Sequence, residues 1–196
     1  MPHRSMRAAA RRAPPLLVSS EHCRRRGFGS HHPLSIPRVA TVLELCERLG
    51  WLEPGSRREA SAADATELTA FHDAGYVEAL RRSDAAGQVE RDVRERYGFG
   101  TAENPLFEGV FERAATAVGG SILAAELALD GRVVFHPAGG THHGRPSRAS
   151  GFCYFNDPVF AILRLEEAGL ERVLYVDLDA HHGDGVQDAF AEDSRV

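Results

Sequence analysis

The feature that most constrains this chain is residues 172–185, where an apolar run passes directly into a cluster of acids, histidines and glycines. The run at residues 173–176 predicts a short buried strand, because β-branched and aromatic residues without polar interruption suit a sheet covered on both faces. The next side chains able to bind metal come at every second position: Asp177, Asp179 and His181. In an extended segment they leave on one side and can converge on one point.

This convergence favours a divalent metal site at the end of the predicted strand. Carboxylate oxygen and imidazole nitrogen suit an ion such as zinc, with bonds of about 2.0–2.2 Å. The expected direct ligands are Asp179 and His181. The alternative is that the acids, including Asp184, cap a helix near residues 185–190 and that the histidines are ordinary loop residues.

Two motifs, taken together, resemble the histone deacetylase family of the arginase/deacetylase superfamily, which includes bacterial acetoin utilisation proteins and acetylpolyamine amidohydrolases. Residues 139–144, Gly-Gly-Thr-His-His-Gly, and residues 151–157, Gly-Phe-Cys-Tyr-Phe-Asn-Asp, resemble its paired catalytic histidines and the aromatic wall of its acyl tunnel. Residues 177–185 resemble its metal-binding motif. The resemblance implies an α/β fold, with three layers (α/β/α) around a mostly parallel sheet.

The resemblance also implies a role for each polar residue of the motifs. His142 and His143 would act on a water molecule as general base and as general acid or electrostatic partner, and the division between them is open. Asp177 would orient His142 and Asp184 would orient His143, because a carboxylate fixes the far ring nitrogen of its histidine. Two such pairs beside a pair of ligands indicate amide hydrolysis.

Cofactors and substrate contacts follow from the same resemblance. The metal would be Zn²⁺, with Fe²⁺ as the alternative. Potassium ions would bind near backbone carbonyls, at Asp177, Asp179, His181, Phe190, Asp193 and Val196. The acyl tunnel would be lined by Gly140, Gly151 and Phe152, with Glu103 at its rim. Glu103 departs from the aspartate that the family usually carries there, and without the resemblance Phe152 would be a core aromatic and Glu103 an acid preceding a helix.

Domain organisation is predicted from the extent of the resemblance. Residues 16–196 are expected to form the N-terminal part of a single deacetylase-like domain, and residues 1–15 a disordered basic N-terminus. The family completes its metal site with a further aspartate and its oxyanion stabilisation with a tyrosine, in motifs that this sequence does not contain. We therefore expect a fragment, truncated at the C-terminal side and inactive alone.

Hydrophobic spacing predicts the other elements. Strands are expected at 16–18 and, as a buried strand, at 133–135. Helices are expected from Pro37 to before Gly50, at 65–82 (broken or in two parts), at 111–129, and from Pro158 to before Gly169 with Asp157 as N-cap. A charged surface loop is expected at 83–100. Strand, helix and strand from 133 to 176 form a βαβ unit, so both motif loops should open on the same edge of a parallel sheet. The remaining conspicuous histidines, His31, His32 and His72, are interpreted as ordinary structural residues.

Composition restricts the class of partner and the compartment. A net charge of −5 over 196 residues argues against direct nucleic-acid binding. No apolar run is long enough to predict a membrane span. The cysteines, Cys23, Cys46 and Cys153, are odd in number and lack a CxxC pattern, which suits a reduced cytoplasmic protein. Assembly into an oligomer is left open.

The predicted function is therefore zinc-dependent hydrolysis of the N-acetyl amide of acetyl-lysine, an acetylated polyamine or a small acetylated metabolite. A non-catalytic acyl-binding or assembly module, completed by a partner chain, is the alternative. Arginase-like hydrolysis with two metals is disfavoured, because the paired histidines are followed by the aromatic segment at 151–157.

Overall fold

The fold is built on a small parallel sheet. The computed structural model describes residues 13–24 and 27–196, so most of the expected N-terminal extension lies outside the described residues. The strands are β1 (Leu16–Ser19), β2 (Arg57–Glu59) and β3 (Val134–Phe135), in the order β2-β1-β3 with both pairs parallel. Every residue of β1 is buried, as expected of an apolar central strand. The predicted strand at 16–18 and the parallel α/β arrangement are confirmed. The strand predicted at 133–135 is present at 134–135, but its expected burial is wrong, because Val133 and Phe135 are 60 % and 49 % exposed.

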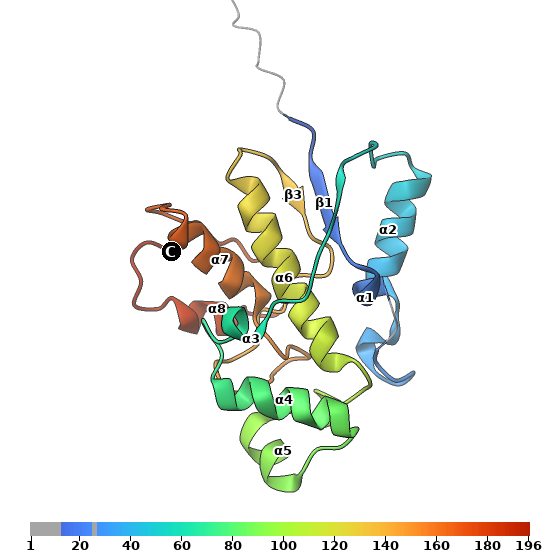
Figure 1. Ribbon diagram of the computed structural model, residues 1–196, viewed down its shortest axis with the longest axis vertical. Coiled ribbons are helices and arrows are strands. Elements are labelled where there is room, and N and C mark those ends of the chain that lie inside the picture. The colour runs from blue at the N-terminus through green and yellow to red at the C-terminus, as the bar shows by residue number, and fades with distance from the viewer. Residues whose placement is uncertain (1–12, 25–26) are drawn as a thin grey trace, which may run out of the picture.

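Helices surround this sheet. In chain order they are α1 (Glu21–Arg24), the 3-10 helix η1 (Pro33–Ser35), α2 (Arg38–Arg48), α3 (Ala65–Leu68), α4 (Ala74–Ala86), α5 (Arg91–Tyr97), α6 (Val110–Ala128), α7 (Asp157–Glu167) and α8 (Asp184–Ala189). Figure 1 shows α6 running through the centre of the molecule, with α7 and α8 to one side, α1 and α2 to the other, and α4 and α5 at one end. No helix in the described part of the chain is long and apolar enough to cross a membrane.

Helix α6 organises the packing because it contacts β1, β3, α1, α4 and α7. Two glycines near the middle of α6 let neighbouring segments pack closely against it. A side chain at Gly119 would collide with the backbone carbonyl of Ser61, and one at Gly120 would collide with the ring of His136. The helix continues through both glycines without a break.

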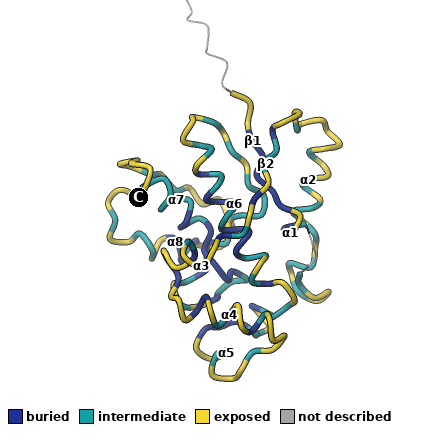
Figure 2. Tube along the Cα trace, viewed as in Figure 1, coloured by how far each residue is buried: buried dark blue, intermediate teal, exposed yellow. Residues whose placement is uncertain are grey.

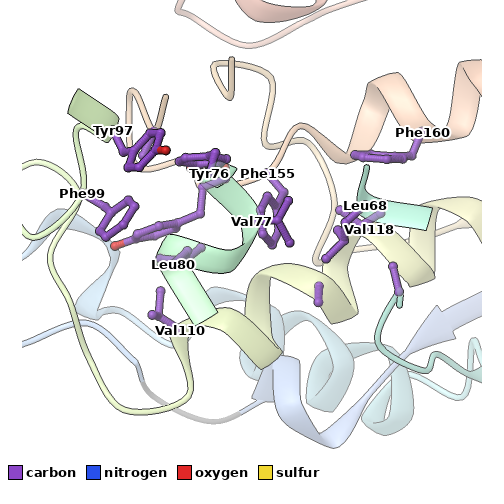
Figure 3. Close-up of a cluster of buried hydrophobic side chains, with 14 of the residues drawn as sticks. Leu68, Tyr76, Val77, Leu80, Tyr97, Phe99, Val110, Val118, Phe155 and Phe160 are labelled. Atoms are coloured by element: carbon purple, nitrogen blue, oxygen red, sulfur yellow. Dashed lines mark hydrogen bonds between the residues drawn. The ribbon is translucent and has the colours of Figure 1, made fainter. Parts of the chain in front are cut away.

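The main hydrophobic core lies between α4, α6 and the segment at 149–160 that follows the paired histidines. Tyr76, Phe99 and Phe155 are its largest fully buried side chains, and the Tyr76 hydroxyl donates to the backbone carbonyl of Tyr154 at 2.6 Å. Figure 3 shows these rings among the aliphatic side chains of α3, α4 and α6. Burial on this scale is the dominant stabilising contribution to a fold of this size.

His72 belongs to this core, as the sequence analysis predicts. It is 2 % exposed. Its Nδ1 lies 2.9 Å from the carbonyl of Arg145, and its Nε2 accepts from the backbone N–H of Asn156 at 3.1 Å. This arrangement requires a neutral ring with its proton on Nδ1. Burial correspondingly lowers the pKa of His72 to about 4.

The surface loop predicted at 83–100 is wrong. Helix α4 continues to Ala86, and α5 occupies 91–97. The charged residues of this segment lie on the exposed face of α5, where Arg91 and Glu95 pair at 2.8 Å with i,i+4 spacing. Its last residue, Tyr97, points into the core. Charge density alone therefore misidentified a short amphipathic helix.

The buried strand predicted at 173–176 is also wrong. This segment has no strand assignment, and the side chains of Leu174 and Val176 are 86 % and 64 % exposed. Figure 2 shows buried chain in the centre of the molecule and exposed chain in the loops at its edges. A strand needs a neighbour for its backbone hydrogen bonds, and no strand among the described residues pairs with 173–176. The βαβ unit is therefore present only as its first strand and helix.

Candidate active site

The two histidine and aspartate motifs meet in space. The rings of His142 and His143 lie 4.1 Å apart between centroids. Asp177 Oδ2 is 2.7 Å from His142 Nδ1, and Asp184 Oδ1 is 2.6 Å from His143 Nδ1. Because a carboxylate only accepts, each histidine donates from Nδ1 and keeps Nε2 for a substrate or water. The structure thus contains both pairings that the sequence analysis expected.

The first pair, His142 with Asp177, has neutral hydrogen-bond donors around it. The side chain of His142 is 8 % exposed. Asp177 also accepts from the Tyr175 hydroxyl at 2.7 Å and from the backbone N–H of Asp179 at 3.0 Å. Burial raises the pKa of Asp177, but the hydrogen bonds from His142, Tyr175 and Asp179 outweigh it and lower that pKa to about 2. Asp177 is therefore an anion at neutral pH.

The second pair, His143 with Asp184, has a cation beside it. Arg145 Nη2 lies 2.6 Å from Asp184 Oδ2, and its Nη1 donates to Asp188. Burial raises the pKa of Asp184, whereas the His143 hydrogen bond and the Arg145 charge lower it, with a net decrease. The sequence analysis missed Arg145, although an arginine two residues after the paired histidines was a readable signal.

Asp157 holds the loop that carries both histidines. The prediction that it caps α7 is wrong: it is the first residue of that helix, and Asn156 is at the cap. Its carboxylate accepts from the backbone N–H groups of Gly140 at 3.0 Å and Thr141 at 2.7 Å, and from Ser121 Oγ at 2.5 Å. The Thr141 hydroxyl donates to it as well. An acid before a proline resembles a cap, so only the tertiary structure shows this role.

The expected metal ligands lie beside the second histidine. Asp179 Oδ1 is 2.9 Å from His181 Nδ1, and the rings of His143 and His181 are 6.2 Å apart. Both donor side chains are more than half exposed. One oxygen and one nitrogen directed at each other fit part of a site for a borderline divalent ion. Among the described residues, however, no group of three His, Cys, Asp or Glu side chains is placed to hold one.

A cavity of about 790 Å³ connects these groups with the expected substrate contacts. Its lining includes all of the residues expected at the acyl tunnel and its rim, together with both histidines and both metal donors: Glu103, Gly140, His142, His143, Gly151, Phe152, Asp179 and His181. At Gly151 an added side chain would strike the ring of His143, so glycine permits the close approach. Phe152 has φ = 68°, the only left-handed non-glycine residue in the described part of the chain.

The carbonyls expected near potassium are partly engaged. The Phe190 carbonyl accepts from the Asp193 N–H at 3.0 Å, and the Asp193 carbonyl accepts from the Val196 N–H at 3.3 Å. Each carbonyl retains a second lone pair. Potassium binding here and at the 177–181 carbonyls stays a prediction.

Comparisons with known proteins identify one family. The family model described as "Histone deacetylase domain" matches residues 32–196. The chain is 37 % identical over 172 residues to acetoin utilization protein AcuC of Bacillus subtilis, covering 86 % of this chain and 44 % of that protein. It is 39 % identical over 164 residues to histone deacetylase 8 of Xenopus tropicalis, covering 82 % and 44 %.

Solved structures give the same result. A crystal structure of an HDAC homolog from Aquifex aeolicus matches with a TM-score of 0.88 and 36 % identity, over 94 % of this chain and 50 % of that one. An HDAC homolog complexed with SAHA matches with a TM-score of 0.85 and 37 % identity, over 91 % and 48 %. The chain thus spans about half the length of these solved structures, and 44 % of the curated relatives.

Proposed function

Because the chain belongs to the histone deacetylase family, we propose that it carries the histidine pairs and acyl channel of a metal-dependent deacetylase. The substrate would be the N-acetyl amide of acetyl-lysine, an acetylated polyamine or a small acetylated metabolite. The observation that carries this proposal is the pair of hydrogen-bonded dyads, His142–Asp177 and His143–Asp184, lining one cavity. Two imidazoles with free Nε2 atoms can accept one proton and deliver another, as amide hydrolysis requires.

The residues of the chain divide the work of hydrolysis. A divalent ion, Zn²⁺ or Fe²⁺, held by Asp179 and His181 would supply Lewis acidity and water activation. Nε2 of one histidine would take a proton from the attacking water and leave that ring as an imidazolium. The leaving amine would then receive a proton from the Nε2–H of an imidazolium, either this ring or its neighbour in the doubly protonated form. Asp177 and Asp184 hold the Nδ1 protons and so fix the tautomer of both rings.

The channel residues select the substrate arm. Phe152 presents an aromatic face, and Gly140 and Gly151 leave room for a narrow aliphatic chain beside it. Glu103, at the exposed end of the cavity lining, would accept a hydrogen bond from a substrate N–H. This shape suits the four-carbon stem of an acylated lysine or a polyamine arm.

Further properties belong to the same proposal. We place the protein in the cytoplasm, because its three cysteines are unpaired in the structure. Potassium would bind near the carbonyls of 177–181 and 190–196. The described residues supply two of the metal ligands to the site. Other groups would complete the metal coordination and stabilise the oxyanion.

A second candidate function is an acyl-binding or assembly module completed by another polypeptide. It is favoured by the exposed apolar side chains of Leu174, Val176 and Leu178, which are 86 %, 64 % and 92 % exposed. Exposed apolar side chains at every second position along a segment are typical of a surface that another segment covers. This surface lies directly before and within the proposed metal-binding segment.

One experiment separates the two functions. The chain, and the same chain extended through any coding sequence after Val196, are loaded with zinc and assayed on an acetyl-lysine peptide beside His142→Ala. Turnover by either form that is lost in His142→Ala supports the deacetylase. Tight binding of a hydroxamate without turnover in either form supports the module. The exposed His31 provides the matched control as His31→Ala, which should retain wild-type behaviour.

A further inference from the structure

His32, which the sequence analysis interpreted as an ordinary structural residue, has an unusually complete set of contacts. Its Nδ1 accepts from the backbone N–H of Leu34 at 3.0 Å, and its Nε2 lies 3.2 Å from the backbone carbonyl of Glu103. With Nδ1 accepting, Nε2 carries the proton and donates to Glu103. The ring is therefore fixed in orientation by hydrogen bonds at both nitrogens.

Two phenylalanine rings also contact the His32 ring. The ring stacks on Phe28 at 4.4 Å with an interplanar angle of 18°, and it meets Phe152 edge-on at 4.6 Å and 76°. Phe28 in turn packs against Phe107 at 4.8 Å. Four rings from three separate segments therefore form one continuous row.

Three of these four rings belong to the channel wall. Phe28, Glu103, Phe107 and Phe152 all line the cavity, whereas His32 itself is not among its lining residues. His32 therefore joins the three segments without touching the space that a substrate arm would fill. Its influence on a substrate would pass through Phe152 and the segment around Glu103.

Phe152 needs such support. A left-handed backbone conformation is unfavourable for a residue with a Cβ atom and persists only where the surroundings impose it. The turn that carries Phe152 is closed by reciprocal hydrogen bonds between Ser150 and Cys153, of 3.1 and 2.8 Å. The His32 ring is positioned to keep the phenyl ring of Phe152 against the channel.

We propose that His32 is a positioning residue that sets the width, and hence the acyl preference, of the channel by fixing Phe152 and the Glu103 segment. The inference rests on the proposed deacetylase function for its consequence, but the positioning itself is a property of the fold. Selectivity between a short and a long acyl group depends on how firmly the wall is held, because a loosened wall admits larger groups.

The first measurement is hydrogen exchange, which requires no activity. In His32→Ala, the backbone amides of Ser150 and Cys153 should exchange about tenfold faster than in wild type, since an aromatic contact and a hydrogen bond are lost together. His31→Ala, the adjacent exposed histidine, should leave them unchanged. Unchanged exchange at Ser150 and Cys153 in a folded His32→Ala variant would overturn the positioning role. If His32→Ala does not fold, His32→Leu, which also removes the aromatic contacts and both hydrogen bonds but keeps an apolar side chain, should accelerate exchange at the same two amides by several-fold. Unchanged exchange in His32→Leu would overturn the positioning role.

The second measurement tests the consequence, on whichever form of the chain turns over acetyl-lysine. The ratio of kcat/KM for acetyl-lysine to that for octanoyl-lysine should fall at least about fivefold in His32→Ala, mainly through KM for the acetyl substrate. An unchanged ratio would overturn the claim on acyl preference. If wild type hydrolyses no acyl-lysine at all, the proposed function fails, while the exchange result still decides whether His32 positions Phe152.

Discussion

The two histidine–aspartate pairs contain the same residue types but differ in what surrounds the aspartate. Besides the bond from its histidine, the Asp177 carboxylate accepts hydrogen bonds from two neutral donors, a tyrosine hydroxyl and a backbone amide. The Asp184 carboxylate forms an ion pair with the guanidinium of Arg145. A cation beside the carboxylate reduces the field that the carboxylate exerts on its histidine, whereas neutral donors leave most of it. Two dyads that a motif presents as equivalent are therefore electrostatically distinct.

The largest expected effect comes from removing either imidazole. In whichever form of the chain turns over acetyl-lysine, His142→Ala and His143→Ala should each lower kcat by at least about 100-fold, since proton transfer by a positioned side chain contributes about 10²–10⁴-fold. Metal content, measured by elemental analysis, should be unchanged in both, because neither residue is an expected ligand. If one variant retained more than a tenth of the activity, the two pairs would not share the reaction.

Asp157→Asn should affect both pairs equally, because Asp157 holds the loop from which both histidines project. An amide can accept on one side only, so at least one buried donor loses its acceptor. We expect the free energy of unfolding in urea to fall by about 2–4 kcal/mol. The matched control is Asp92→Asn, an exposed acid in the first turn of α5, where the change should stay within about 0.5 kcal/mol. Equal losses in the two variants would show that Asp157 is only a helix-terminal acid.

What the sequence predicts and what it does not can be seen in these same residues. The resemblance of the motifs predicts that His142 pairs with Asp177 and that His143 pairs with Asp184, and both hydrogen bonds are present. Their chemical roles stay predictions. The sequence does not predict the hydrogen-bond partners that make the two pairs different. Arg145 and Asp184 are 39 residues apart, and either side chain could have faced solvent.

The misassigned elements have a related cause. Segment 173–176 has the composition of a strand, but composition does not supply a neighbour to pair with. The α5 segment has the charge of a loop, yet the burial of Tyr97 makes one face of it apolar. In both segments tertiary packing, and not local preference, decides the structure.

Arg145→Gln should act on the second pair alone. It removes the cation from Asp184 and leaves the donors of Asp177 in place. Because hydrogen bonds to charged groups contribute about 1.5–3 kcal/mol, kcat should fall by roughly 10–100-fold. Arg145→Lys should recover only part of this loss, since an ammonium cannot reproduce the planar contact with two carboxylates. Full activity in Arg145→Gln would mean that the electrostatic difference between the pairs has no catalytic consequence.

Tyr175→Phe gives the smallest effect and makes the comparison quantitative. It removes one neutral hydrogen bond from Asp177, worth about 1 kcal/mol, so kcat should fall about fivefold. The backbone N–H of Asp179 and Nδ1 of His142 remain to hold the carboxylate. In the double variant with Arg145→Gln the two losses should add, because the variants act on different carboxylates. A double-mutant cycle of kcat values measures this directly, and a coupling energy above about 0.5 kcal/mol would show that the two pairs work as a single unit.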